Sequence, residues 1–146
     1  MLSDLRAATL GGAPRIRARE LSVKQAYSMA GIGPDDVDVC ELHDCFSIAS
    51  LIAAESLGFA EYGKAGEMWE KGEFDRGGKV AINMSGGLKS KGHPIGATGA
   101  SQAVDIVHQM RGEVEPGRQV EDVKIGLTDT LGGDGVLCNM VLQRGW

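Results

Sequence analysis

The sequence predicts a layered α/β domain with a mixed sheet, and three observations support this prediction. Helical and extended patterns alternate along the chain in the order helix, strand, helix, strand, helix, strand, strand. Glycine makes up 22 of the 146 residues and is concentrated in two segments, 85–99 and 126–135. An apolar content of 42% is enough for one buried core, so residues 1–146 are interpreted as a single domain.

The N-terminal part begins with a poorly defined lead-in, residues 1–19, which shows no convincing periodicity and contains a GGAP turn. A helix is predicted over 20–30, and Gly31 provides its stop signal. The side chains expected on its buried face are Leu21, Ala26, Met29 and Ala30.

The middle of the chain predicts a strand, a helix and a long connection. Residues 37–42, VDVCEL, alternate in polarity and contain two valines, which is typical of a strand. Residues 47–58 are rich in helix formers, and Ser47 is the expected N-cap. The connection 59–78 is long enough to be functional or to cover another part of the molecule. Its aromatic residues, Trp69 and Phe74, either line a pocket or pack locally.

The second half predicts three more strands and one helix. Residues 79–83 form a short strand before the first glycine-rich segment. The following helix, 97–112, has small side chains in its first turn, which permits close packing against a sheet. Two strands, 123–130 and 135–143, are joined by a tight turn at GGD, residues 132–134.

Charge and hydropathy exclude several classes of protein. The net charge is -5 with a pI of 5.2, and no basic stripe is present, which argues against a nucleic-acid partner. Apolar stretches are far shorter than the ~20 residues that cross a bilayer, and the first residues lack the apolar core of a secretory signal. We therefore expect a soluble cytoplasmic protein.

The three cysteines, Cys40, Cys45 and Cys138, have no CxxC spacing. Neither a disulfide framework nor a zinc site is predicted from them. Cys40 and Cys138 stand in apolar runs and are interpreted as buried small residues.

The segment 83–100, NMSGGLKSKGHPIGATGA, carries the strongest chemical signal. It follows a strand and opens a helix, where backbone N–H groups favour developing negative charge. Small residues let a substrate approach the backbone, and Pro94 restricts the backbone of His93. The histidine can act on a thiol or a carbonyl oxygen, or it can be a structurally satisfied side chain in a turn. The small residues are Ser85, Gly86, Gly87, Gly92, Gly96, Ala97 and Gly99. The segment matches neither a P-loop nor a GxGxxG motif.

Residues 85–99, SGGLKSKGHPIGATG, resemble the GHP loop of thiolases, in the form found in sterol-carrier-type thiolases and their archaeal and bacterial relatives. The resemblance implies that His93 is catalytic: it activates a nucleophilic cysteine and contributes to an oxyanion hole. It also implies that substrate contacts come from Ser85, Gly86, Gly92 and Gly132.

Residues 41–50, ELHDCFSIAS, match a second thiolase motif by position. A histidine at a strand end is by itself more often structural, although ligands of open α/β sheets gather at such ends. The resemblance implies that His43 positions a water molecule or the thioester oxygen. Asp44 is then a supporting acid or a helix cap, and Cys45 replaces a small residue of the family and is interpreted as structural.

Residues 126–142 depart from the family. The resemblance places Thr130 where thiolases carry the cysteine of a C-x-G motif, and Asp134 where a third glycine is usual. A threonine hydroxyl titrates far above a thiol's pKa of ~8.5, so reversible Claisen condensation is in doubt. Asp129 or Asp134 either replaces the proton carrier or belongs to turn chemistry.

The resemblance covers residues 16–144 and implies a thiolase-like C-terminal domain with a mixed, roughly five-stranded sheet flanked by helices. The family's first strand is poorly represented in 1–12. The nucleophilic cysteine belongs to an N-terminal half, so the chain is interpreted as an isolated half, from a split gene or a cut chain. We expect acyl-CoA as substrate, no other cofactor and no metal, and a homo- or hetero-oligomer containing the N-terminal half.

Three functions are compatible with these residues. The first is an acyl-CoA acyltransferase of the acetyl-CoA C-acetyltransferase type. The second is a thiolase-like aldolase or lyase that works with an OB-fold partner, which the missing C-x-G cysteine favours. The third is a non-catalytic lipid-binding or interaction module. A cysteine hydrolase using Cys45 and His93 is a weaker alternative.

Overall fold

A four-stranded mixed sheet forms the centre of the computed structural model, which describes residues 15–133 and 135–145. Its strand order is β2-β1-β3-β4, in which β1 is parallel to both neighbours and β3 is antiparallel to β4. The strands are β1 (Val39–Glu41), β2 (Ala81–Ile82), β3 (Ile125–Leu131) and β4 (Leu137–Gln143). The predicted mixed sheet is confirmed. The expected count of roughly five is one too high for the described residues, and residues 1–12, where the family's first strand was sought, lie outside them.

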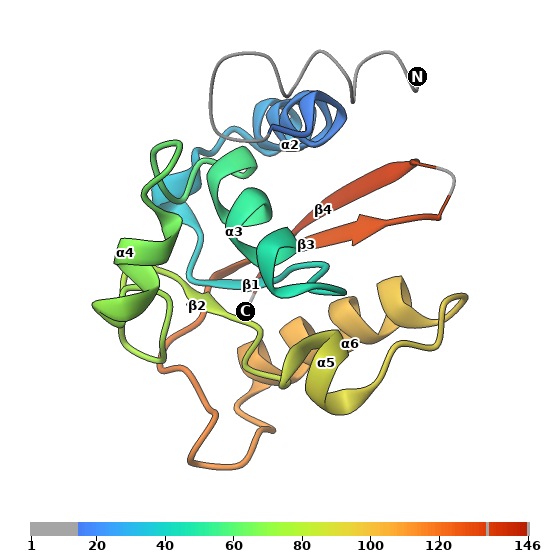
Figure 1. Ribbon diagram of the computed structural model, residues 1–146. Helices are drawn as coiled ribbons and strands as arrows, with labels where there is room; N and C mark the ends of the chain where they lie inside the picture. The colour runs from blue at the N-terminus through green and yellow to red at the C-terminus, as the bar shows by residue number, and fades with distance from the viewer. Residues whose placement is uncertain (1–14, 134, 146) are drawn as a thin grey trace.

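Helices cover both faces of the sheet (Figure 1). α2 (Arg17–Ala30) and α3 (Ser47–Ser56) lie on one face, and α6 (Thr98–Arg111) lies on the other. The connection 59–78 contains a short helix, α4 (Ala65–Glu70), and the first glycine-rich segment contains another, α5 (Gly87–Lys91). Neither short helix was predicted. No helix among the described residues combines the length and the apolar character needed to cross a membrane.

The two faces of the sheet carry separate apolar clusters. On the α2–α3 face, Leu127 packs with Phe59 and Phe74, each 0–1% exposed. On the α6 face, Ile106 packs with Val39. The successive β1 side chains Val39 and Cys40 therefore point into different clusters, as the pleat of a strand requires. Trp69 contacts Phe74 edge to face at 4.6 Å, so the aromatic pair of the long connection packs locally.

The buried face of α2 differs from the predicted one. Its buried residues are Arg19, Val23 and Tyr27, four residues apart, whereas Leu21 is 57% and Met29 81% exposed. The two polar side chains have partners inside the protein: Tyr27 donates to the carbonyl of Leu57, and Arg19 pairs with Asp129. The prediction followed apolar residues alone and therefore selected the wrong stripe. The helix does end at Gly31, which adopts the left-handed conformation.

Two smaller predictions were wrong. Ser47 is the first residue of α3 rather than its N-cap, which is Phe46 and makes no side-chain cap bond. Cys138 is exposed because β4 is an edge strand with one outward face, whereas Cys40 in central β1 is buried as expected.

Gly126 lets α6 approach β3 closely. A methyl group added there would lie 2.3 Å from Cγ2 of the fully buried Ile106. We expect Gly126→Ala to lower the free energy of unfolding by about 1–3 kcal/mol, because overpacking forces neighbours to move. Urea denaturation measures the change, with Gly117→Ala, which meets open space, as the matched control. Ile106→Ala in the same chain should recover part of the added cost; no coupling between the two substitutions would contradict the steric explanation.

Candidate functional site

His43 and His93 lie in contact, although 50 residues separate them in the sequence. Their ring centroids are 4.9 Å apart and their planes meet at 84°, an edge-to-face arrangement. His43 follows the end of β1, and His93 lies in the loop that follows the neighbouring parallel strand β2 and helix α5. Parallel strands place their carboxyl ends at one edge of the sheet, and this edge is where ligands of open α/β sheets bind.

His43 is buried, with 4% of its surface exposed, and its ring is oriented by β3. The backbone N–H of Leu131 donates to its Nδ1 over 3.4 Å. A neutral imidazole whose Nδ1 accepts a hydrogen bond carries its proton on Nε2. Burial is the largest cause that lowers the pKa of His43 from its ordinary value of 6.5, and the neighbouring His93 lowers it further. The ring is therefore held neutral, with Nε2 as a donor.

His93 is exposed and has the opposite tautomer assigned by its neighbours. Its Nδ1 lies 2.7 Å from Oγ1 of Thr98, and that hydroxyl lies 3.1 Å from the carbonyl oxygen of Pro94. The carbonyl of Pro94 can only accept, so the single hydroxyl proton of Thr98 is donated to it. The Thr98 oxygen must then accept from the ring of His93, which places a proton on Nδ1. Nε2 of His93 then carries a lone pair and can accept a proton.

The two rings thus have complementary capacities. One presents an N–H donor that can stabilise a developing oxyanion, and the other presents a base that can remove a proton from a nucleophile. Within the described residues, the hydrogen bonds of both rings use Nδ1, so Nε2 of each remains for a ligand.

Hydrogen bonds join the segment 42–45 after β1 to the glycine-rich segment. Oδ1 of Asp44 accepts the N–H of Leu88 at the start of α5 over 2.7 Å. Gly87 has a positive φ of 64°, and a methyl group there would lie 2.3 Å from Oδ2 of Asp44, so only glycine fits. The side chain of Asn83 exchanges two hydrogen bonds with the backbone of Leu42 and so continues the pairing of β1 with β2. Asp44 therefore caps the start of α5 through its bond with Leu88.

A buried carboxylate at the end of β1 binds the start of the glycine-rich segment. Glu41 accepts hydrogen bonds from both the backbone N–H and the hydroxyl of Ser85, at 3.1 and 2.5 Å. Lys91 lies 3.5 Å from Glu41 and also pairs with Asp105 of α6. Burial is the main cause that raises the pKa of Glu41. Ser85, expected at the substrate, uses its hydroxyl in this anchor.

Thr130 points toward α6 and packs against Gly99, where an added methyl group would lie 3.2 Å from its hydroxyl oxygen. That hydroxyl donates to Oε1 of Gln102 over 2.6 Å. Asp129 occupies the other face of β3 and pairs with Arg19. Asp134, the other proton carrier considered, lies outside the described residues.

The remaining glycines that were expected to contact the substrate lie in loops. Gly86 and Gly92 flank α5 with φ of 98° and 101°. Gly132 lies in the turn after β3, where its N–H donates to the carbonyl of Val136. Cys45, half-buried, follows His43 by two residues.

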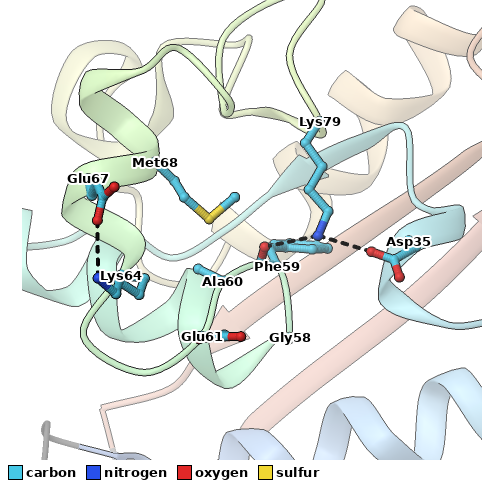
Figure 2. Close-up of a pocket in the computed structure, with 9 residues that line it drawn as sticks. All are labelled: Asp35, Gly58, Phe59, Ala60, Glu61, Lys64, Glu67, Met68 and Lys79. Carbon is cyan, nitrogen blue, oxygen red and sulfur yellow. Dashed lines mark hydrogen bonds and ion pairs between the residues drawn. The ribbon is translucent and has the colours of Figure 1, made fainter.

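An open pocket of 520 Å³ lies elsewhere, beside α4 (Figure 2). Lys79 crosses it to contact Asp35 at 3.0 Å and the carbonyl of Phe59 at 3.3 Å. Neither His43 nor His93 lines this pocket, so the pocket is separate from the site that the two histidines form.

Sequence reasoning missed Thr98, Glu41 and Asn83 as supports of the site. Thr98 stands five residues after His93 in the same motif, so its position was the one available signal. The other two act across distant parts of the chain: Asn83 bonds to Leu42, and Glu41 to Ser85.

The pKa of His43 predicts a pH dependence of stability. Because this pKa is lowered on folding, the unfolded chain binds the proton more readily. The contribution of His43 is complete above its ordinary pKa of 6.5 and is lost as the pH falls through the lowered folded value. We expect His43→Asn to reduce the loss of unfolding free energy between about pH 7 and pH 5, measured by urea denaturation. His108→Asn is the exposed control; an equal slope in both variants would contradict the assignment.

Comparison with known proteins identifies the family. The family described as "Thiolase C-terminal domain-like" matches residues 12–142. An acetyl-CoA acetyltransferase of Methanothermobacter thermautotrophicus is 47% identical over 121 residues, covering 83% of this chain and 31% of that protein. Sterol carrier protein 2 of Rattus norvegicus is 43% identical over 125 residues, covering 86% of this chain and 23% of that protein.

A solved structure of an "Ltp2-ChsH2(DUF35) aldolase" shares the fold, with a TM-score of 0.79 and 25% identity, covering 90% of this chain and 33% of that chain. The chain thus spans between 23% and 33% of the length of these relatives. The match over residues 12–142 and the identities above 40% place this chain in the thiolase C-terminal domain-like family.

Proposed function

We propose that this chain is the C-terminal part of a thiolase-like acyltransferase of the acetyl-CoA C-acetyltransferase type. The observation that carries the proposal is the contact between two histidines with opposite tautomers, one a donor and one a base. Acyl-CoA is the substrate. Its thioester oxygen accepts from Nε2–H of His43, and Nε2 of His93 takes the proton of a cysteine thiol.

The nucleophile comes from an N-terminal thiolase half. Cys40 is buried, and burial raises the pKa of its thiol well above the ordinary value, so it is not a nucleophile. Cys138 is exposed on the edge strand, away from the contact pair in the sequence and on another element. Cys45 stands in the motif at a position where the family has a small residue. An incoming cysteine therefore completes the pair of histidines.

Exposed apolar side chains support such a cover over the site. Of the nine large exposed hydrophobic residues in the described part of the chain, four belong to segments that begin or end at the carboxyl edge of the parallel strands. They are Phe46, Ile48, Ile95 and Val136. Since His93 is itself exposed, a second protein surface is needed to exclude water from the reaction. Burial of such a patch favours a homo- or hetero-oligomer containing the N-terminal half.

A second candidate function is a thiolase-like aldolase or lyase that acts on acyl-CoA with an OB-fold partner. The geometry of Thr130 favours it, because its hydroxyl proton is already donated to Gln102 and is a poor acid near neutral pH. The similarity to a solved aldolase supports the same alternative.

A chimera tests the role of His93. Residues 12–142 replace the corresponding segment of the Methanothermobacter acetyl-CoA acetyltransferase, whose remaining part supplies the other half. We expect the chimera to exchange labelled CoA with acetyl-CoA: the cysteine thiolate displaces CoA from the thioester, and His93 returns the proton to the CoA thiolate. His93→Asn should lower this exchange by about 10²–10⁴-fold, because it removes the base.

The control for the chimera is His108→Asn, which changes an exposed histidine of α6. The 146-residue chain alone should show no exchange. Undiminished exchange in the His93 variant would make this residue a structurally satisfied histidine and remove the proposal.

Thr130 separates acyl exchange from condensation. In the chimera, acetoacetyl-CoA formation from two acetyl-CoA molecules should be slow, since Thr130 provides no thiol to carry the proton in the condensation step. We expect Thr130→Cys to raise condensation by about tenfold or more while acyl exchange changes little, measured by acetoacetyl-CoA absorbance and by label exchange. Thr130→Ser is the matched control. Strong condensation with Thr130 in place would argue against the aldolase alternative.

A further inference from the structure

Arg19 of α2 and Asp129 of β3 form an ion pair inside the protein, 110 positions apart in the sequence. Nε of Arg19 lies 2.9 Å from Oδ1 of Asp129, and both side chains are 0% exposed. Desolvation of two charges offsets most of their attraction, so a pair of apolar residues would stabilise the fold about as well. Stability alone is therefore a weak reason for this pair.

The carboxylate of Asp129 holds the backbone of His43. Its Oδ2 accepts the N–H of His43 over 3.3 Å. β1 ends at Glu41, so this N–H lies beyond the ladder in which Glu41 pairs with Thr128. The carboxylate thus provides an acceptor at the point where the chain leaves the sheet.

The same strand also holds the ring of His43. Leu131, two residues after Asp129, donates its N–H to Nδ1 of the imidazole. β3 therefore fixes His43 twice, through its backbone at Asp129 and through its ring at Leu131. Any shift of Asp129 relative to the end of β1 changes both contacts, and the tautomer of His43 depends on the second one.

Arg19 and Asn139 fix the carboxylate itself. Oδ1 of Asp129 accepts Nε of Arg19 and Nδ2 of Asn139, the latter over 3.1 Å. Among the described residues, Nη1 and Nη2 of Arg19 have no hydrogen-bond partner although they are buried. The guanidinium therefore makes one directed bond, to the carboxylate that holds His43.

We infer that Arg19 and Asp129 are positioning residues for His43: the Asp129 carboxylate fixes the histidine at the end of β1, and Arg19 fixes the carboxylate. The inference rests on the proposed function only in the use made of His43, since the contacts themselves do not involve a substrate. Arg19 of α2 and Asp129 of β3 would then act on the site without touching the acyl group.

Charge separates this role from a purely structural one. The groups that act on His43 are His93, Asp44, Asp129 and Arg19. Asp129 raises the pKa of His43 through its negative charge, and Arg19 lowers it through its positive charge. Loss of structure, by contrast, would return the pKa toward its ordinary value of 6.5 in every variant.

The experiment is an NMR titration of the histidine rings in the 146-residue chain, whose three histidines are assigned by single substitution. We expect Asp129→Asn, which keeps an acceptor oxygen, to lower the pKa of His43 further. Arg19→Met should raise it. Asp122→Asn and Arg144→Met, which remove an ion pair with an exposed aspartate, are the matched controls and should leave it unchanged. Shifts in the same direction, or no shift in folded single variants, would overturn the inference.

A neutral double variant covers the case in which a single substitution prevents folding. Arg19→Met with Asp129→Leu removes both charges together, a replacement that buried ion pairs tolerate. Amide hydrogen exchange at His43 should then be at least about tenfold faster relative to exchange at Leu127, because the acceptor is gone. Unchanged relative exchange, or failure of this variant to fold, would assign the pair to stability and overturn the inference. Thioester turnover is not measured, so a wrong proposed function leaves these outcomes unaffected.

Discussion

The parallel pairing of β1 with both neighbours is the constraint on which the site depends. β1 pairs with β2 through Val39 and Ala81, and with β3 over three residues. Because parallel strands end on the same side, the segments that follow them emerge together. His43 lies two residues after the end of β1, and the loop carrying His93 follows β2 and α5. The N–H of Leu131, at the end of β3, then reaches the ring of His43.

Close approach between backbone elements brings α5 and α6 against this edge of the sheet. Gly126 and Gly99 let α6 lie against β3, and Gly87 lets α5 begin against Asp44. At each of these positions glycine leaves room for a neighbouring element to pack against the backbone. The loop that carries His93 is therefore held between α5 and α6, both of which contact the rest of the domain closely. Thr98 lies at the start of α6 and also holds Nδ1 of His93. The fixed position of α6 therefore determines the tautomer of the histidine.

Sequence patterns predicted the mixed sheet and the order of its longer elements, because these depend on local periodicity, and two thiolase-like motifs assigned His43 and His93 to one site. They failed where burial and polarity disagree. Arg19 and Tyr27 form the buried face of α2, since each has a partner far along the chain that no local pattern reveals. Glu41 was passed over for the same reason: its partner Ser85 is 44 residues away. The short helix α5 was missed because its capping carboxylate, Asp44, comes from another element.

Thr130 limits what the histidine pair can do by itself. The pair provides a base and an oxyanion donor, which are sufficient to move an acyl group between two thiols. Carbon–carbon bond formation requires in addition that a proton be removed from the acyl α-carbon, or returned to it when the bond breaks. Thr130, which the resemblance aligns with the family's cysteine for this step, donates its hydroxyl proton to Gln102, whose own amide donates to the backbone of Asp129. Since that hydroxyl is engaged and weakly acidic, the structure supports thioester activation more directly than condensation.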